Sequence, residues 1–169
     1  MKLPVCHVIP LDYRYVYCII RTMKKLLTTL LFAVLAVAST HAWAFCFKEA
    51  ADRYQVDERL LRAIARTENA AYDPRLVIRD KDGWEYIGLM MISTIWLPEL
   101  KKYGIDRERL MDPCINVNVG AWVLRDAQVR YGATWKSVGA FNTGKYSDDT
   151  AAQRRYITKV WRNFNKENR

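Results

Sequence analysis

One acidic side chain, Glu68, stands out because it lies on the apolar face of a predicted helix. Leu61 and Ile64 repeat at helical spacing, and Glu68 follows them by seven and four residues, on the same face. The helix is expected to end directly after Glu68, ahead of Pro74, where the helix dipole disfavours a negative charge. Burial and dipole should both raise the pKa of this carboxyl group. The sequence therefore predicts a group able to donate and accept a proton near neutral pH.

Two other interpretations of the acidic residues stay open at this point. From spacing alone, Glu68 is equally well explained as a structural acid paired with Arg62 or Arg66. A second catalytic carboxylate for ordinary hydrolysis would have to come from the acids near a predicted turn, which are Asp80, Asp82 and Glu85. We interpret these three as solvated turn charges.

Residues 45–169 contain no histidine, and this absence limits the chemistry. Ser-His and Cys-His nucleophiles are excluded, and a metal site is not expected, so we predict an enzyme without metal or cofactor. The whole chain has a formal charge of +9, but residues 45–169 carry 22 basic and 17 acidic side chains, which is +5. The basic residues are interleaved with acids rather than clustered, so nucleic acid is not an expected partner.

The first 44 residues have the pattern of a secretory leader. Lys24 and Lys25 precede an uncharged apolar run at 26–38, and small residues at Ala42 and Ala44 match a cleavage site after Ala44. The apolar run has about 13 residues and a membrane-spanning helix needs about 20, so retention of the run as an uncleaved anchor is the weaker interpretation. No stable membrane span is expected after cleavage. Residues 23–44 already contain a charged start, an apolar core and a cleavage site. Residues 1–22 therefore either precede the true start at Met23 or form a long n-region of the signal peptide. We predict an exported, periplasmic domain of residues 45–169.

The cysteine count agrees with export. Cys6 and Cys18 fall in the leader, which leaves Cys46 and Cys114 as an even pair in an oxidising compartment. We expect these two to form one disulfide, which ties the start of the domain to its middle.

The remaining pattern predicts a mainly helical domain with one small β-hairpin. The expected helices span 47–54, 58–68, 94–103, 113–131, 135–140 and 150–164, and Thr134 is the expected cap of the fifth. Strands at 76–79 and 84–87 flank a turn with Gly83. The tryptophans at 96, 122 and 135 are expected in helical core positions.

Three motifs occur in a fixed order: Leu61 to Glu68, Gly88-Leu89-Met90-Met91-Ile92, and Ala140-Phe141-Asn142-Thr143-Gly144. Together they resemble the soluble lytic transglycosylase domain, and the resemblance covers essentially all of residues 45–169. The fuller pattern is similar to the small IagB and IpgF type, which is associated with type III or type IV secretion systems and pili.

The resemblance implies a goose-lysozyme-like α+β fold in which Glu68 faces a sugar-binding groove beside the hairpin. It implies that Gly88, Leu89 and Met90 line the site, that Asn142 lies opposite, and that Tyr156 reaches toward the catalytic carboxyl group. The implied substrate is the glycan strand of peptidoglycan. Its MurNAc-GlcNAc bond would be cleaved to a 1,6-anhydro sugar by a single Glu.

Three substrate-binding positions depart from the family pattern, which usually has Ser, Gln and Tyr where this chain has Asn69, Met91 and Phe141. Met91 is the most serious change, because a thioether cannot replace the hydrogen-bond donors of an amide. These departures motivate the alternatives of a weak or inactive glycan-binding assembly factor, or a hydrolytic muramidase.

Overall fold

Capping residues set the ends of the first two helices. Helix α2 spans Phe47–Tyr54 and ends where Gln55 adopts a left-handed conformation, with its N–H bonded to the Ala51 carbonyl. Helix α3 spans Glu58–Glu68, and the side chain of Asp57 accepts hydrogen bonds from the first backbone N–H groups of the helix. Both bounds agree with the sequence prediction. Glu68 is therefore the last residue of its helix.

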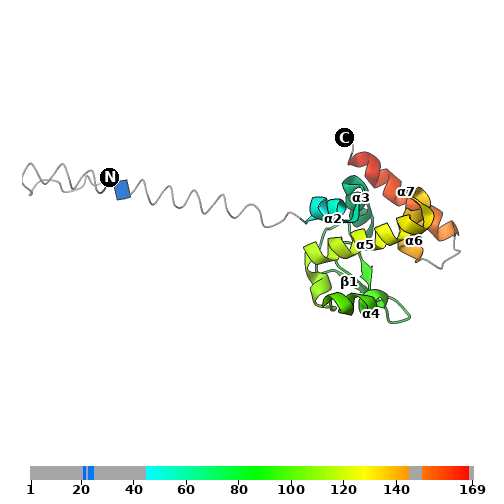
Figure 1. Cartoon of the computed structure of the whole chain (residues 1–169), viewed down its shortest axis with the longest axis horizontal. Helices are drawn as coiled ribbons and strands as arrows, with labels where there is room; N and C mark the ends of the chain where they lie inside the picture. Colours follow the sequence, from blue (N-terminus) through cyan, green and yellow to red (C-terminus); the bar gives the residue numbers. More distant parts are fainter. Residues whose placement is uncertain (1–20, 22, 25–44, 145–149, 168–169) are drawn as a thin grey trace, which may run out of the picture. The chain divides into compact units, whose positions relative to one another are not determined.

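The structure is a computed structural model that describes residues 21, 23–24, 45–144 and 150–167 (Figure 1). The predicted cleavage site, the apolar run of the leader and Cys6 and Cys18 lie outside the described residues. Residues 45–169 form one unit by themselves. No helix among the described residues is long and apolar enough to cross a membrane.

The predicted hairpin is the main part of a small antiparallel sheet. Strand β1 (Val77–Arg79) pairs with β2 (Glu85–Ile87), with Ile78 opposite Tyr86. A third strand, β3 (Ile92–Ser93), pairs with β2 on its other side and was not predicted. It is only two residues long, too short for a period-two pattern to show in the sequence.

The segment after the sheet is less regular than predicted. The expected helix at 94–103 is divided into the 3-10 turn η2 (Thr94–Trp96), the short α4 (Leu97–Leu100) and the 3-10 turn η3 (Lys101–Tyr103). A further 3-10 turn, η4 (Arg109–Met111), precedes the longest of the described helices. Gly104 ends η3 with a positive φ, as a helix-terminating glycine does.

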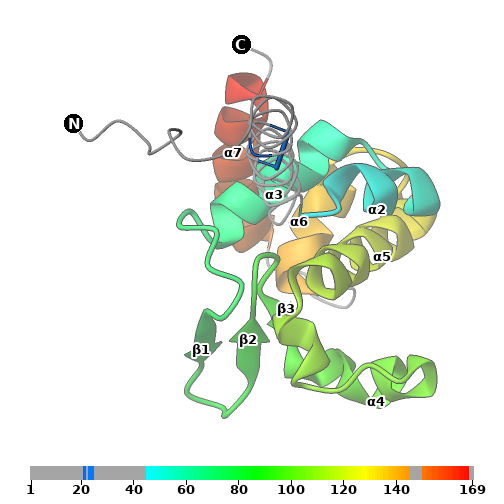
Figure 2. The same ribbon diagram turned by 90° about the vertical axis from the view of Figure 1, so that its left-hand side faces the viewer.

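Helix α5 (Pro113–Tyr131) is the central element, buried on several sides. It is capped by Asp112, whose side chain accepts a hydrogen bond from the Ile115 N–H, as predicted. Helix α6 (Trp135–Thr143) continues three residues beyond the predicted end at 140, and α7 spans Thr150–Lys166. Figure 2 shows the sheet and α4 below the helices α3, α6 and α7.

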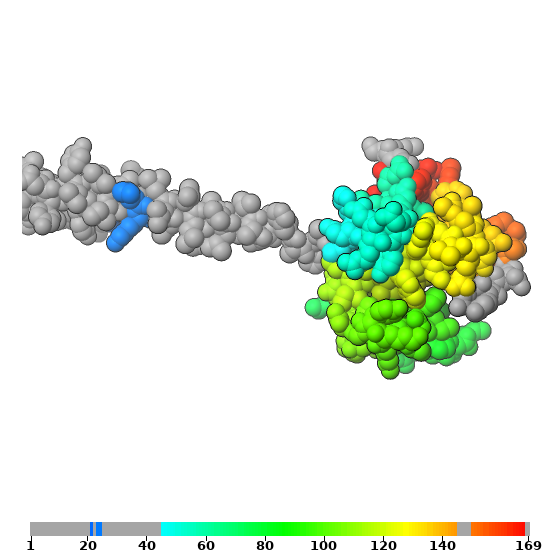
Figure 3. Space-filling view, viewed as in Figure 1, coloured from blue at the N-terminus to red at the C-terminus, as the bar shows by residue number. Residues whose placement is uncertain are grey.

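The core lies among α2, α3, α5, α6, α7 and the sheet, with fully buried Leu61, Ile64, Ile87, Leu124 and Val160. The Cys46–Cys114 disulfide is present and joins the start of α2 to the first turn of α5, as predicted. In the space-filling view the green segment with the sheet and α4 lies below the cyan and yellow helices (Figure 3). The domain is therefore mostly helical, with a small sheet at one side.

Candidate active site

Glu68 meets the last helix at the end of α3. The hydroxyl group of Tyr156 on α7 donates a hydrogen bond to Glu68 Oε1 at 2.6 Å. Tyr156 is itself 6% exposed, so α7 holds the phenol firmly against the carboxyl group. Two further contacts fix α7 beside α3, because Asn163 donates to Thr67 and Arg66 pairs with Glu167.

The surroundings of Glu68 favour its neutral form. Burial raises the pKa of the Glu68 carboxyl to about 7, against the hydrogen bond from Tyr156 and the positive charge of Lys159, which both lower it. Burial and the Glu68 charge also raise the pKa of Tyr156, so this phenol stays a donor. Glu68 can therefore hold a proton near neutral pH and return as a base after giving it up.

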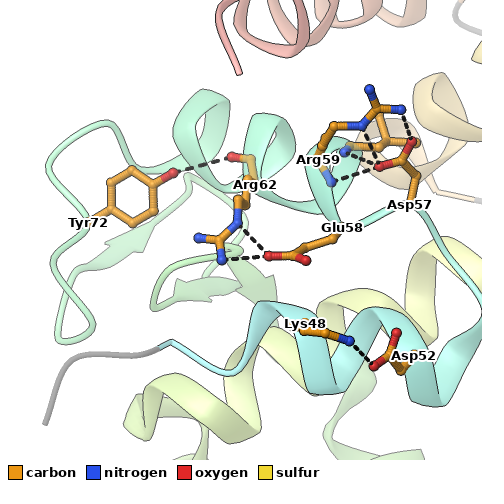
Figure 4. Close-up of polar contacts among 8 residues, drawn as sticks. Lys48, Asp52, Asp57, Glu58, Arg59, Arg62 and Tyr72 are labelled. Atoms are coloured by element: carbon orange, nitrogen blue, oxygen red, sulfur yellow. Dashed lines mark hydrogen bonds and ion pairs between the residues drawn. The ribbon is translucent and has the colours of Figure 1, made fainter. Parts of the chain in front are cut away.

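The alternative of an arginine-paired structural acid is wrong. Arg62 turns toward Glu58, at 2.6 Å, in the direction of the preceding helical turn (Figure 4). Arg66 pairs with Glu167 at 3.2 Å. The helix places both guanidinium groups on a different face from Glu68, which faces Tyr156 instead.

Glu68 lies in a groove of about 970 Å³ between the sheet and the helices. The groove runs from β2 and β3 past η2, α4 and α5 to the end of α6. Its aromatic lining residues are Trp84, Tyr86, Trp96, Trp122 and Phe141. A concave surface with aromatic rings and one proton-transfer group suits a carbohydrate chain, since sugar faces stack on aromatic rings.

The structure brings Met91, Phe141 and Asn142 to the groove together with Glu68. Asn142 and Phe141 come from the last turns of α6. Met91 reaches the groove from the turn between β2 and β3 in a left-handed conformation with φ 46°, which is unusual for a residue with a side chain.

The structure places Asn69, Gly88, Leu89 and Met90 behind the groove rather than in its lining, unlike the expectation from resemblance. Leu89 and Met90 are fully buried in the core, and Gly88 is also buried. The turn that carries them is short, so only its last residue, Met91, can face the groove while the others pack inward.

Buried amides hold this turn in place. Asn69 donates to the carbonyls of Asp73 and Gly88, and Asn116 donates to the Ile87 carbonyl while accepting from the Met90 N–H. A side chain at Gly88 would overlap Asn116, so the glycine permits this close approach. In the same way Gly120 leaves room for the Met90 side chain.

Several groove residues were missed by sequence reasoning. Trp96 and Trp122 pack against the core, as predicted, but also line the groove. Trp135 is 38% exposed, so its assignment to the core was wrong. Tyr86 could have been found, because alternation along β2 places it on the opposite face from its buried neighbours Glu85 and Ile87.

The interpretation of Glu85 as a solvated turn charge is also wrong. Glu85 is 9% exposed and is held by Arg107 at 2.6 Å and Arg79 at 2.7 Å. These two hydrogen-bonded arginines lower the pKa of Glu85 to about 2. Asp80 accepts a hydrogen bond from the Tyr86 hydroxyl group. Within the described ranges no group of three acidic, histidine or cysteine side chains is arranged to hold a metal ion.

Comparisons with known proteins agree with this geometry. The chain resembles the 70 kDa soluble lytic transglycosylase of Escherichia coli with a TM-score of 0.60 and 22% identity, over 73% of this chain and 23% of that one. The chain thus spans about a quarter of that enzyme. The likeness shows a lysozyme-like fold, which confirms the predicted fold class.

The sequence comparisons are more specific. The family model "Transglycosylase SLT domain" matches residues 45–164. The invasion protein IagB of Salmonella typhimurium is 39% identical over 126 residues, which is 74% of this chain and 78% of IagB. A "peptidoglycan-binding-like protein" of Escherichia coli O157:H7 is 32% identical, over 81% of this chain and 86% of that protein. The chain therefore belongs to the transglycosylase SLT domain family of peptidoglycan lytic transglycosylases.

Proposed function

We propose that this protein cleaves the MurNAc-GlcNAc bond of peptidoglycan and leaves 1,6-anhydroMurNAc ends, with Glu68 as the single acid and base. The observation that carries this proposal is the partly buried Glu68 in an aromatic groove, hydrogen-bonded to Tyr156 and with its pKa raised to about 7. A carboxyl group in this state can protonate a leaving oxygen at neutral pH.

The reaction can be written with this one carboxyl group. Glu68 gives its proton to the glycosidic oxygen as the bond from muramoyl C1 breaks, and the substrate's own N-acetyl group stabilises the sugar cation. The Glu68 carboxylate then takes the proton of the C6 hydroxyl group as that oxygen bonds to C1. The proton returns to Glu68, no water is consumed, and the enzyme is regenerated.

Ordinary hydrolysis would require a second carboxylate to activate water or to act as nucleophile. Glu99 and Asp126 are also in the groove lining, but Lys102 and Arg130 pair with them at 2.6 and 2.7 Å. Glu85 is held by two arginines. These pairings favour the single-carboxyl reaction over a hydrolytic one.

The groove residues around Glu68 are proposed to bind the glycan. Asn142 offers amide hydrogen bonds, and Phe141 and Met91 offer apolar contact with sugar faces. Asn69, Gly88, Leu89 and Met90 support the binding of glycan indirectly, by holding the turn that presents Met91.

We further propose that the protein acts in the periplasm, after export, and opens the wall locally for a secretion system or pilus. Support for this role comes from the similarity to the invasion protein IagB and from the predicted leader at 23–44. The Cys46–Cys114 disulfide is also consistent with an oxidising compartment.

To test the proposal, residues 45–169 with the disulfide intact are incubated with purified peptidoglycan. The released muropeptides are then identified by mass spectrometry. Products lighter by one water than hydrolytic products, absent with the Glu68→Gln protein, are expected. Reducing ends would instead establish a hydrolytic muramidase. If folded protein binds the glycan but releases nothing at any pH, it is a glycan-binding assembly factor, and Met91→Gln becomes the first variant to examine.

A further inference from the structure

Three aromatic rings form a patch on the surface of the last two helices. Trp135 begins α6, and its ring packs edge-on against the ring of Phe164 on α7 at 6.1 Å. Trp161 precedes Phe164 by three residues, which places both rings on the same side of α7. Trp135 is 38% exposed and Trp161 is 52% exposed. We call these three residues the α6–α7 aromatic patch.

The aromatic patch is separate from the catalytic groove. In the part of the chain that the structure describes, none of its three residues lines the groove. Helix α7 turns Tyr156 and Val160 toward the core, and Tyr156 meets Glu68 from that side. Trp161 is exposed to solvent instead. A partner bound at the patch would therefore leave the groove open.

Helix α7 surrounds the patch with positive charge. The helix, Thr150–Lys166, contains five basic side chains and no acidic one. Residues 45–169 have 22 basic and 17 acidic side chains, a surplus of five, so the rest of the domain is balanced in charge. The surplus is thus concentrated in the helix that carries two of the three rings.

The cations of α7 are not neutralised within the domain. All five are exposed, and they are Arg154, Arg155, Lys159, Arg162 and Lys166. Cations elsewhere, such as Lys102 and Arg130, are held by acids at 2.6 and 2.7 Å. Within the described ranges none of the five cations of α7 forms an ion pair. An anionic partner would therefore meet charges that are still available to it.

We propose that the α6–α7 aromatic patch and the cations of α7 bind the surface of an anionic phospholipid bilayer. Trp prefers the boundary between headgroups and acyl chains, because its ring is apolar and its N–H group is polar. Arg and Lys beside it are attracted by the anionic headgroups. Exposed indole rings on a cationic helix without acids are typical of helices that lie on a membrane surface.

The arrangement of rings and charges favours a bilayer over a small anion. The five cations are spread over about 18 Å of helix at 1.5 Å per residue, so they match an extended charged surface. A purely electrostatic partner would give no role to two exposed indole rings, whereas a bilayer removes their apolar area from water. The binding does not depend on catalysis. Only its place at a cell membrane rests on the proposed export.

The test measures how residues 45–169, disulfide intact, sediment with lipid vesicles. One set of vesicles contains phosphatidylglycerol and phosphatidylcholine in equal parts, and the other contains phosphatidylcholine alone. Trp161→Ser removes the most exposed ring of the patch. Arg154→Gln with Arg162→Gln removes two cations, one on either side of Trp161 in the sequence.

Two matched controls change the same residue classes away from α7. Tyr103→Ser removes a ring that is 67% exposed on η3. Lys101→Gln with Arg125→Gln removes two exposed cations and the same charge as the arginine variant. Neither control touches a residue of the groove lining.

We expect the unchanged protein to sediment with the mixed vesicles at low salt and not with phosphatidylcholine alone. The arginine variant should weaken the partition to mixed vesicles roughly tenfold or more. Trp161→Ser should weaken it about three- to tenfold, because less apolar area leaves water. Both controls should bind as the unchanged protein does. High salt should weaken binding, since exposed charges are screened.

Absence of binding to the mixed vesicles at low salt would overturn the inference. So would equal losses in the patch variants and the controls, or binding that depends on charge but not on Trp161. Patch variants that lose binding to purified peptidoglycan while keeping their binding to vesicles would assign the patch to the wall instead. The Glu68→Gln protein should bind vesicles as the unchanged protein does, so membrane binding and the proposed reaction can fail separately.

Discussion

Two glutamates of this domain, Glu68 and Glu85, are both withdrawn from solvent, yet their protonation is opposite. Glu68 at the end of α3 faces the phenol of Tyr156, and burial raises its pKa to about 7. Glu85 in β2 is held by Arg79 and Arg107, and its pKa is lowered to about 2. The first is a proton donor at neutral pH and the second is a permanent anion.

The comparison shows that burial alone does not make an acid catalytic. At Glu68 the loss of solvation is the largest influence, and a hydrogen bond from a neutral phenol is too weak to offset it. At Glu85 the hydrogen bonds from two guanidinium groups outweigh a smaller loss of solvation. The helix end at Glu68 and the sheet at Glu85 thus use one residue type for two purposes, proton transfer and structure.

The largest expected difference between the two glutamates is in turnover. Glu68→Gln should lower the release of muropeptides by about a thousandfold or more, because the amide cannot donate a catalytic proton. Glu85→Gln should stay within about threefold, since Glu85 does not line the groove. Comparable losses in both variants, with both folds intact by circular dichroism, would show that the contrast drawn here is mistaken.

The same contrast should appear in stability. Between pH 4.5 and 7 native Glu68 keeps a proton that the unfolded chain has released, so its contribution to stability is lost as pH rises through about 7. Glu68→Gln removes this loss and should stabilise the domain by up to about 3 kcal/mol at pH 8 and by little at pH 4. Urea unfolding at both pH values measures it. A stability gain of the variant over the unchanged protein that is no larger at pH 8 than at pH 4 would contradict the raised pKa.

A smaller effect is expected from the phenol. Tyr156→Phe removes a hydrogen bond that favours the carboxylate, so the pKa of Glu68 should rise further and the basic limb of the pH–rate profile should move to higher pH. We expect kcat to fall by about tenfold, because the carboxylate formed during the reaction loses its donor. Tyr103→Phe, at an exposed residue, is the matched control. If the basic limb of the pH–rate profile does not move, Tyr156 contributes only packing and does not act on the pKa of Glu68.

The smallest effect is expected at the second glutamate. Arg107→Gln removes one of the two cations that hold Glu85, so the domain should be less stable at neutral pH. The depressed pKa of Glu85 means that its contribution to stability is present above pH 4.5 and is lost as pH falls toward 2. The difference from the unchanged protein should therefore shrink in urea titrations near pH 2 to 3. A loss that is the same at every pH would point to packing instead.

Much of the fold could be predicted because its signals are local. Asp57 and Asp112 mark helix starts by their own hydrogen bonds to the next turn, and the turn around Gly83 sets the hairpin. The division of 94–103 into three short elements could not be predicted, since its apolar residues suit both a continuous helix and short elements, the first of which contacts α5 through Trp96 and Trp122.

The candidate site was only partly predictable for a related reason. The spacing of Glu68 from Leu61 and Ile64 marked it as a buried acid, and the Cys46–Cys114 pair followed from counting. Whether Tyr86, Trp96 and Trp122 face the groove or the core depends on how the sheet and the helices pack together. This packing joins segments that are distant in the sequence, so a local pattern does not reveal it.

The sequence by itself determined where most of the helices begin, that Glu68 lies on the apolar face of its helix and which cysteines pair, because these depend on spacing and on the properties of neighbouring residues. Spacing alone did not show that Glu68 meets Tyr156, 88 residues later; the family resemblance implied this contact and the tertiary structure contains it. Only the tertiary structure decided that Arg62 turns to Glu58. It also decided that Glu85 is paired and that Met91 alone of its turn faces the groove. The physical reason is that a pKa and an exposed face depend on neighbours in space, and folding brings those neighbours from distant parts of the chain.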